Sequence, residues 1–318
     1  MIFSIIIPAY KDTFLRECID SVLRQTYDNY EVIIVNDDSP NDLDSIVKSY
    51  NDNHLRYYKN EKNYGAVRMV ENWNHCLEYA TGDFVINIGD DDRLLPNCLE
   101  DYKNLIAKYP ELDVFHTRLQ FIDEKSRIID FQEARPERES VYSMIWHFWR
   151  HRRQRIGDWC FRTSALKEHG GYYNMKLGWG ADDLTAFSMA KEKGVANTAT
   201  FGFQYRENRQ TITSNSNYAF IKAETVLELK KWYNSFLETI PNDPTDQLYR
   251  IILKRELGQQ LKKYIIANIE TSLNEHPNVL FRWMKECKHY KISRLKVMSL
   301  YVHIMNYKIK TSLKKLTN

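Results

Sequence analysis

The chain has 318 residues, 43% of them hydrophobic and 27% charged, which is enough for one large domain with an appendage or for two domains. Its net charge of +3 gives no sign of a polyanionic partner such as nucleic acid. The five cysteines are odd in number and scattered, which excludes a disulfide framework or a zinc site and favours reduced thiols in a cytoplasmic protein.

The chain opens on an apolar run at 1–7 that is too short for a signal peptide, so we expect a first strand there. No run approaches the roughly 20 apolar residues of a transmembrane helix. Up to residue 96, apolar strands alternate with amphipathic helices. The predicted strands are 4–8, 31–35, 55–58 and 84–88, and the predicted helices are 13–25, 42–51 and 66–80. This alternation predicts an α/β domain with a mainly parallel sheet.

Three consecutive carboxylates, Asp90, Asp91 and Asp92, follow the strand at 84–88. A core does not bury such charges unpaired. Hard oxygen ligands favour Mg²⁺ or Mn²⁺, and magnesium-type sites usually join one or two carboxylates to substrate phosphates. The triplet therefore indicates a metal that holds a diphosphate. The alternative is an acidic surface turn in which Asp92 caps the next helix.

Two other predicted strands also end on unusual residues, namely Pro8 to Tyr10 and the pair Asp37-Asp38. Ligands of open α/β sheets bind beyond the carboxyl ends of the strands. The coincidence of three such ends favours a binding site over a surface turn.

In the second half we expect a helix at 97–108, strands at 114–122 and 158–162, and a polar connection at 124–139 between them. The run 146–155 mixes aromatic and basic residues, which fits either a phosphate or acceptor site or an exposed basic helix face. Asp182 and Asp183 precede a helix at 184–193. Helix capping and the helix dipole explain one acid at this position, but they need not explain both.

From about residue 219 the pattern is helical. Nine Lys and Arg after residue 284 oppose one acid, Glu286, so this tail carries +8. Its apolar residues recur at steps of three or four, which predicts basic amphipathic helices. Such helices either pack on the domain or lie on an anionic membrane surface.

Taken in order, these segments resemble the inverting nucleotide-sugar glycosyltransferases of family 2. The resemblance covers about residues 1–213. It rests on the segments 4–10, 18–27, 31–39, 63–65, 80–83, 90–96, 170–172 and 181–183. Each motif alone is weak, but their ordered set is specific.

The resemblance implies a GT-A fold, a Rossmann-like mainly parallel central sheet flanked by helices. The catalytic domain would span 1–213, with a nucleotide-binding half at 1–96 and an acceptor-binding half at 97–213. A basic helical region would follow at 214–318.

In this family Pro8, Ala9 and Tyr10 would form part of the nucleobase pocket, with Tyr10 stacking on the base. Asp37 would read the base edge, and a carboxylate that accepts from an imide N–H selects uracil or thymine over cytosine. Arg68 lies where relatives place a basic residue near the nucleotide. Asp90 or Asp91 would contact the ribose or a metal-bound water.

Asp92, with Asp90 beside it, would bind Mn²⁺ or Mg²⁺ in the family's DXD motif, which neutralises the leaving diphosphate. Asp183 would be the general base that takes a proton from the acceptor hydroxyl. Asp182 and Trp179 would lie at the acceptor side. Arg206 or Arg209 would meet the diphosphate, because the His often found after the family's Tyr-Arg region is missing here.

The implied activity is the non-processive, inverting transfer of one hexosyl or N-acetylhexosaminyl unit from a UDP-sugar, or a dTDP-sugar, to a glycan or lipid-linked hydroxyl. By family analogy alone, the setting is bacterial surface polysaccharide synthesis, at the inner face of the membrane. The alternative is a module of the same fold that binds a nucleotide sugar or a glycan without turning it over.

Overall fold

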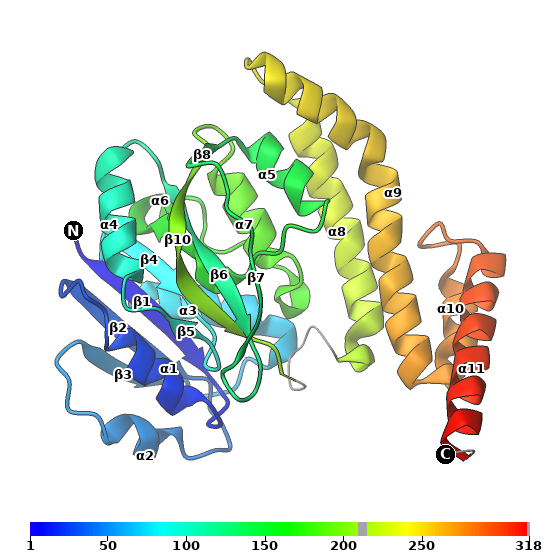
Figure 1. Ribbon diagram of the computed structural model, residues 1–318, viewed down its shortest axis with the longest axis horizontal. Helices are drawn as coiled ribbons and strands as arrows, with labels where there is room; N and C mark the ends of the chain where they lie inside the picture. Colours follow the sequence, from blue (N-terminus) through cyan, green and yellow to red (C-terminus); the bar gives the residue numbers. More distant parts are fainter. Residues whose placement is uncertain (209–214, 317–318) are drawn as a thin grey trace. The chain divides into compact units, whose positions relative to one another are not determined.

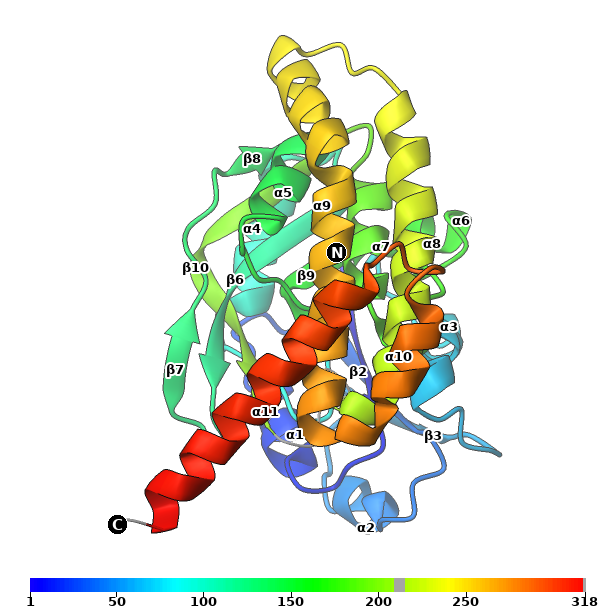
Figure 2. The same ribbon diagram turned by 90° about the vertical axis from the view of Figure 1, so that its right-hand side faces the viewer.

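The structure is a computed structural model that describes residues 1–208 and 215–316. The chain forms two compact units, Met1–Arg209 and Gln210–Asn318. Figures 1 and 2 show the elements of each unit.

The described residues of the first unit contain ten strands in a single sheet. They are β1 (Phe3–Ala9), β2 (Tyr30–Asn36), β3 (Leu55–Lys59), β4 (Phe84–Asn87), β5 (Arg93–Leu94), β6 (Val114–Ile122), β7 (Ile128–Phe131), β8 (Arg138–Glu139), β9 (Trp159–Arg162) and β10 (Val195–Arg206). The main path runs β3-β2-β1-β4-β9-β6-β10-β5, and β7 and β8 pair with β6 and β10. The pairs among β3, β2, β1 and β4 are parallel, as predicted. The second half is mixed, because β9 runs antiparallel to both β4 and β6.

Helices cover both faces of this sheet (Figure 1). They are α1 (Leu15–Val22), α2 (Leu43–Lys48), α3 (Met69–Glu78), α4 (Cys98–Lys108), α5 (Val141–Phe148), α6 (Thr163–Glu168) and α7 (Ala181–Met189), with short 3₁₀ turns at Ala66–Arg68, Ile156–Asp158 and Lys176–Gly178. Alternate residues of β1, β2 and β4 pack with α1, α2 and α4 in the main core. The five cysteines are free and buried, in agreement with the expected reduced thiols.

The polar stretch at 124–139 is not a plain connection. It contains β7 and β8, which pair with the edges of β6 and β10. The residues of β7 are all exposed, including Ile128 at 56% and Phe131 at 58%. Because neither face of this short strand is buried, it lacks the alternation that signals a strand in a sequence.

The arginines of the aromatic and basic run lie after the end of helix α5 at Phe148, so they do not form a helix face. Two of them, Arg152 and Arg153, form ion pairs within the protein. Arg152 Nη1 lies 2.7 Å from Glu139 Oε1, and Arg153 pairs with Asp130 and Glu207. These pairs connect the run to β7 and β8.

The second unit, considered by itself, is helical. It consists of η4 (Ser216–Tyr218), α8 (Ala219–Glu238), α9 (Pro244–Glu275), η5 (Pro277–Val279), α10 (Leu280–Glu286) and α11 (Arg294–Leu316). Helices α8 and α9 pack along each other (Figure 2). Asp243 caps α9 by accepting the N–H groups of Thr245 and Asp246, and buried Trp283 donates to Ser272 Oγ at 2.8 Å. No helix in the described ranges is long and apolar enough to cross a membrane.

Candidate active site

Three strand ends meet at one edge of the sheet. Ala9 lies opposite Asn36 of β2, and Ile6 lies opposite Asn87 of β4. The N–H of Asp37 donates to the Ala9 carbonyl at 2.8 Å. The segments that follow β1, β2 and β4 are therefore neighbours. They hold the predicted residues Pro8, Ala9, Tyr10, Asp37, Asp90, Asp91 and Asp92.

Asp90, the first acid of the triplet Asp90-Asp91-Asp92, binds the backbone at the end of β1. Its Oδ2 atom accepts the N–H groups of Tyr10 at 2.7 Å and Lys11 at 2.6 Å. Its Oδ1 atom lies 3.5 Å from the Lys11 ammonium. Burial raises the pKa of Asp90, while the Lys11 charge opposes that rise. Both oxygens of Asp90 are thus engaged by the protein, which favours a positioning role for it over the expected metal ligation.

Asp91 and Asp92 present one free oxygen each to a common point above Gly89. A Cβ atom built on Gly89 would lie 3.0 Å from both Asp91 Oδ1 and Asp92 Oδ2. Their other oxygens are bound. Asp91 Oδ2 accepts from Lys11 and from Asn208 Nδ2 at 2.8 Å, and Asp92 Oδ1 accepts the N–H of Arg206 at 2.9 Å. Helix α4 begins at Cys98 with Asn97 as its cap, so Asp92 is not a helix cap.

Burial raises the pKa of Asp92 well above its usual range, and the Asp91 charge adds to this effect. Within the described residues, no three His, Cys, Asp or Glu side chains are grouped as a metal site. A magnesium-type ion needs only one or two carboxylates when phosphates complete its shell. The two hard oxygens above Gly89 fit such an ion.

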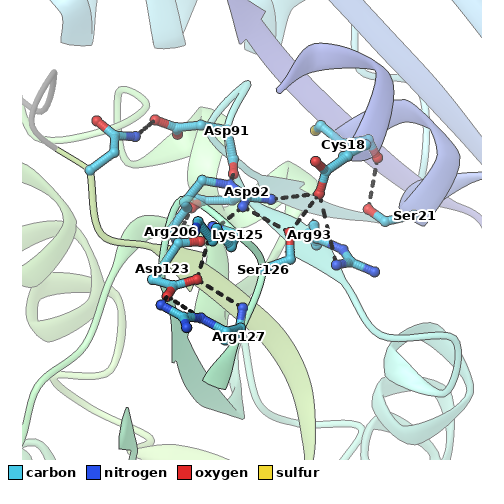
Figure 3. Close-up of polar contacts among 12 residues, drawn as sticks. Cys18, Ser21, Asp91, Asp92, Arg93, Asp123, Lys125, Ser126, Arg127 and Arg206 are labelled. Atoms are coloured by element: carbon cyan, nitrogen blue, oxygen red, sulfur yellow. Dashed lines mark hydrogen bonds and ion pairs between the residues drawn. The ribbon is translucent and has the colours of Figure 1, made fainter. Parts of the chain in front are cut away.

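Arg206 does not face the site as expected (Figure 3). Its side chain is fully buried, its Nη2 donates to Glu17 Oε2 at 2.8 Å, and its Nη1 donates to Ser126 Oγ at 2.9 Å. Its Nε donates to the Asp91 carbonyl at 2.8 Å. Arg206 therefore binds the backbone of the acidic triplet, and its guanidinium is not available to a diphosphate. Arg209 lies outside the described residues.

Asp37 is buried beside β1 and is held from two directions. Its Oδ1 atom accepts from Asn60 Nδ2 at 2.9 Å and from the N–H of Tyr64 at 3.0 Å. Tyr10 is 44% exposed, so its ring is available to a ligand. Asp38, the residue after Asp37, has a φ of +47°, the left-handed region that favours glycine. The loop after β2 therefore holds the Asp38 backbone in a strained conformation.

Arg68 lies on the 3₁₀ turn Ala66–Arg68, close to the Asp37 segment. Its guanidinium lies 4.9 Å from the centre of the Tyr64 ring, and its Nε donates to Glu71 at 3.0 Å. The N–H of the same Tyr64 binds Asp37. Arg68 is thus an exposed cation that contacts Tyr64, and Tyr64 in turn binds Asp37, the acid predicted to read the base.

The second acid pair lies in the first turn of α7. The helix cap is Gly180, with a φ of +83°, so neither acid caps the helix by its side chain. The N–H of Asp183 donates to Asp182 Oδ1 at 3.0 Å. Burial raises the pKa of Asp183 well above its usual range, and the charge of Asp182 raises it further. An acid held in this way is a stronger base than one in water.

Asp183 is also oriented by a buried amide. Gln154 Nε2 donates to Asp183 Oδ1 at 2.8 Å, and Gln154 Oε1 accepts from Arg135 Nη2 at 3.1 Å. Gln154 is 2% exposed and Arg135 is 7% exposed. The Arg135 charge polarises the amide whose N–H group points at the acid. This bond lowers the pKa of Asp183, but burial and Asp182 outweigh it.

Trp179 lies in the loop between the turn Lys176–Gly178 and α7. A Cβ atom on Gly178, which has a φ of +61°, would lie 2.9 Å from the Met69 sulfur and 3.2 Å from the Trp73 ring. The loop therefore packs closely on α3. This contact places Trp179 immediately before the acid pair.

Arg155 and Tyr205 each adjoin, along the chain, a residue that binds one of the acids. The Arg155 guanidinium carbon lies 4.5 Å from the centre of the Tyr205 ring. Arg155 directly follows Gln154, which binds Asp183, and Tyr205 directly precedes Arg206, whose N–H binds Asp92. The two acid clusters are therefore connected through the contact between Arg155 and Tyr205. The two ends of the predicted site lie near each other.

Sequence reasoning assigned no role to several residues of this site, three of which bind the acids directly. Lys11 pairs with the triplet, Gln154 binds Asp183, and Asn208 binds Asp91. Lys11 directly follows a predicted strand end, which is the one signal that would have pointed to it. Gln154 lies in the aromatic and basic run without any pattern of its own.

The comparisons with known proteins point to one family. The family model described as glycosyl transferase family 2 matches residues 4–166. An uncharacterised glycosyltransferase of Rickettsia typhi is 35% identical over 130 residues, which are 40% of this chain and 39% of that protein. The minor teichoic acid biosynthesis protein GgaB of Bacillus subtilis is 26% identical over 302 residues, 86% of this chain and 30% of GgaB. The chain thus matches less than half the length of these relatives.

The fold is also found in solved structures. The S. aureus TarS 1–349 structure in complex with UDP-GlcNAc has a TM-score of 0.59 at 16% identity, and the match covers 98% of this chain and 92% of that one. The likeness at this identity concerns the fold, a mixed α/β domain with flanking helices and further helices after it. The ordered motifs, the sheet that presents them and the family model together show that the chain belongs to glycosyl transferase family 2.

Proposed function

We propose that this protein transfers one sugar from a nucleoside diphosphate sugar, preferably a UDP-sugar, to a hydroxyl of a glycan or lipid-linked acceptor, with inversion and with Mn²⁺ or Mg²⁺. The observation that carries the proposal is the pair of acid clusters, Asp91-Asp92 and Asp182-Asp183, connected through the contact between Arg155 and Tyr205, whose chain neighbours Gln154 and Arg206 bind Asp183 and Asp92. The likeness to GgaB supports a role in bacterial cell-surface glycan synthesis, and the UDP-GlcNAc complex of TarS supports the donor class.

The residues divide the work as follows. Tyr10 offers an exposed ring to a base, and Asp37 offers the carboxylate oxygen that Asn60 and Tyr64 leave free. Asp91 and Asp92 would hold the metal through the oxygens above Gly89. A bound metal would neutralise the charge of the departing diphosphate.

Asp183 would take the proton from the acceptor hydroxyl as its oxygen attacks the anomeric carbon from the face opposite the diphosphate. The proton passes to Asp183, the new glycosidic bond forms, and the bond to the diphosphate breaks. Gln154 fixes one oxygen of Asp183, which leaves the other for the acceptor. Positioning of this kind is what makes an acid an effective base near neutral pH.

A donor panel tests the proposal. We expect a UDP-sugar to bind to the protein more tightly with Mn²⁺ than without it in calorimetry, and more tightly than GDP-sugars do. Sugar transfer from the bound donor would then be measured with lipid-diphosphate sugars as acceptors. If no nucleotide sugar binds in a metal-dependent way, the proposal is wrong, and metal-dependent binding that no acceptor turns over identifies a non-catalytic module.

The pH profile tests the role of the acid pair. Because Asp183 must be unprotonated to act as base, activity falls as pH drops through its raised pKa. The Asp182 charge contributes to that rise, so Asp182→Asn is expected to move the acidic limb of kcat/KM to lower pH. Arg155, Asp158 and Gln154 also affect Asp183, and the variant leaves them in place. An unchanged or upward-shifted limb would contradict the assignment.

For the second unit, we propose contact with an anionic membrane surface through α11. Its side chains Val297 and Leu300 are buried, whereas Leu295, Val302 and Ile309 are 84%, 49% and 58% exposed. Part of the apolar stripe predicted from the sequence is therefore exposed, whereas Ile292 at its start is buried. Basic residues that neighbour it along the helix are Arg294, Lys296, Lys308 and Lys310.

Vesicle sedimentation tests this contact. The double substitution Leu295→Ser/Val302→Ser is expected to reduce pelleting with phosphatidylglycerol vesicles, while Leu248→Ser/Ile251→Ser, at exposed positions of α9, serves as the control. Phosphatidylcholine vesicles should bind neither the protein nor its variants. Equal pelleting of wild type and both variants would remove the proposed role of α11.

A further inference from the structure

We infer that Lys11 is a built-in counter-ion of the acidic triplet that makes metal binding depend on the nucleotide. In the free protein its ammonium pairs with Asp91 Oδ2 and Asp90 Oδ1, beside the oxygens that would hold the metal. When the metal enters with a nucleoside diphosphate, the ammonium turns to the diphosphate. The inference rests on the proposed function, in which Asp91 and Asp92 hold the metal.

The first support is the position of Lys11 in the fold. Its N–H donates to Asp90 Oδ2 at 2.6 Å, so the backbone is fixed at the end of β1, directly after the predicted base-stacking residue Tyr10. Its side chain then returns over the triplet, where Nζ lies 2.5 Å from Asp91 Oδ2 and 3.5 Å from Asp90 Oδ1. A single residue thus adjoins both the nucleotide segment and the acids.

The second support is the charge of the cluster. Among the described residues, Lys11 is the cation whose side chain forms ion pairs with the triplet. Arg206 reaches Asp92 through its backbone N–H, while its guanidinium is bound to Glu17. Without Lys11, three carboxylates would face one another with backbone and amide donors alone. Such a cluster would attract a divalent ion whether or not a nucleotide is present.

The third support is that the ammonium and the metal position share a carboxylate. Lys11 binds Oδ2 of Asp91, and Oδ1 of the same residue lies above Gly89 with Asp92 Oδ2. A divalent ion at that point would be repelled by an ammonium on the other oxygen. The Lys11 side chain is 29% exposed, so it has room to move away. A diphosphate supplies the negative charge that draws it there.

The experiment compares Lys11→Met, which keeps most of the length and removes the charge, with Lys11→Arg, which keeps the charge. Calorimetry or Mn²⁺ paramagnetic resonance gives the Kd of Mn²⁺ alone, and calorimetry gives the Kd of UDP with and without Mn²⁺. We expect Lys11→Met to bind Mn²⁺ alone at least about tenfold more tightly than wild type. It should bind UDP in the presence of Mn²⁺ less tightly. Lys11→Arg should keep the weak binding of free Mn²⁺.

A matched control is Lys193→Met, because Lys193 Nζ forms a similarly short pair with Asp113 Oδ2, 2.6 Å, that involves none of the site residues. It should leave every Kd unchanged. If Lys11→Met binds free Mn²⁺ no more tightly than wild type, the inference is wrong. If UDP binding to wild type does not respond to Mn²⁺ at all, the proposed metal site itself fails, so the two failures are distinguishable. Thermal midpoints establish that each variant is folded.

Discussion

Asp183→Asn is expected to lower kcat by about 10²- to 10⁴-fold while leaving the Kd of UDP within about twofold of wild type. Asn keeps the shape of the side chain and its contact with Gln154, but it does not accept the proton of the acceptor hydroxyl. In the described residues Asp183 is hydrogen-bonded to Gln154 and Asp182, which are not among the predicted nucleotide contacts, so donor binding should persist. The measurement is steady-state turnover beside calorimetry with UDP.

The stability of this variant provides an internal control. Asp183 and Asp182 are neighbours and partly buried, and desolvation, followed by the charge of Asp182, disfavours the charged form of Asp183. Removal of one charge should therefore leave the thermal midpoint unchanged or raise it. A folded Asp183→Asn protein that retains more than about a tenth of wild-type kcat would exclude this residue as the general base.

Asp92→Ala is expected to abolish the effect of Mn²⁺ on UDP binding. In the wild type, couplings of this kind typically tighten binding by about 5- to 150-fold. The variant removes one of the two oxygens above Gly89 and should bind UDP equally with and without the metal. Calorimetric titrations with the same UDP concentrations, one with Mn²⁺ and one without it, give the two Kd values of UDP.

Asp28→Ala is the control for this substitution, because Asp28 is an exposed acid outside the site. It should retain the full response to Mn²⁺. If Asp92→Ala weakens UDP binding by the same factor in both conditions, Asp92 acts on the nucleotide or on the fold and not through a metal.

The half of the fold that carries the nucleotide segments follows closely from the sequence. Strands β1, β2 and β4 are buried on both faces and appear as continuous apolar runs, and parallel pairing places their carboxyl ends at one edge. The acids at those ends were predicted as neighbours for that reason. The strand β7 was missed because its residues are exposed and carry no alternation.

The partners of the acids were harder to predict than the acids themselves. Arg206 looked like a ligand-binding residue, but it is buried against Glu17, which lies 189 positions away along the chain. Lys11 and Gln154 depend in the same way on contacts made only after folding, with Asp91 and Asp183. Sequence patterns report local periodicity, whereas these pairings come from distant segments that the sheet brings together.

The anomeric configuration of the first product tests the central claim most directly. In the proposed mechanism Asp183 acts on the side of the anomeric carbon opposite the departing diphosphate, so a single displacement should convert an α-linked UDP-sugar into a β-linked product. Proton NMR of the product formed in Mn²⁺ would show the large anomeric coupling expected for a β-glucosyl-type linkage. An α-linked product would contradict direct displacement assisted by Asp183.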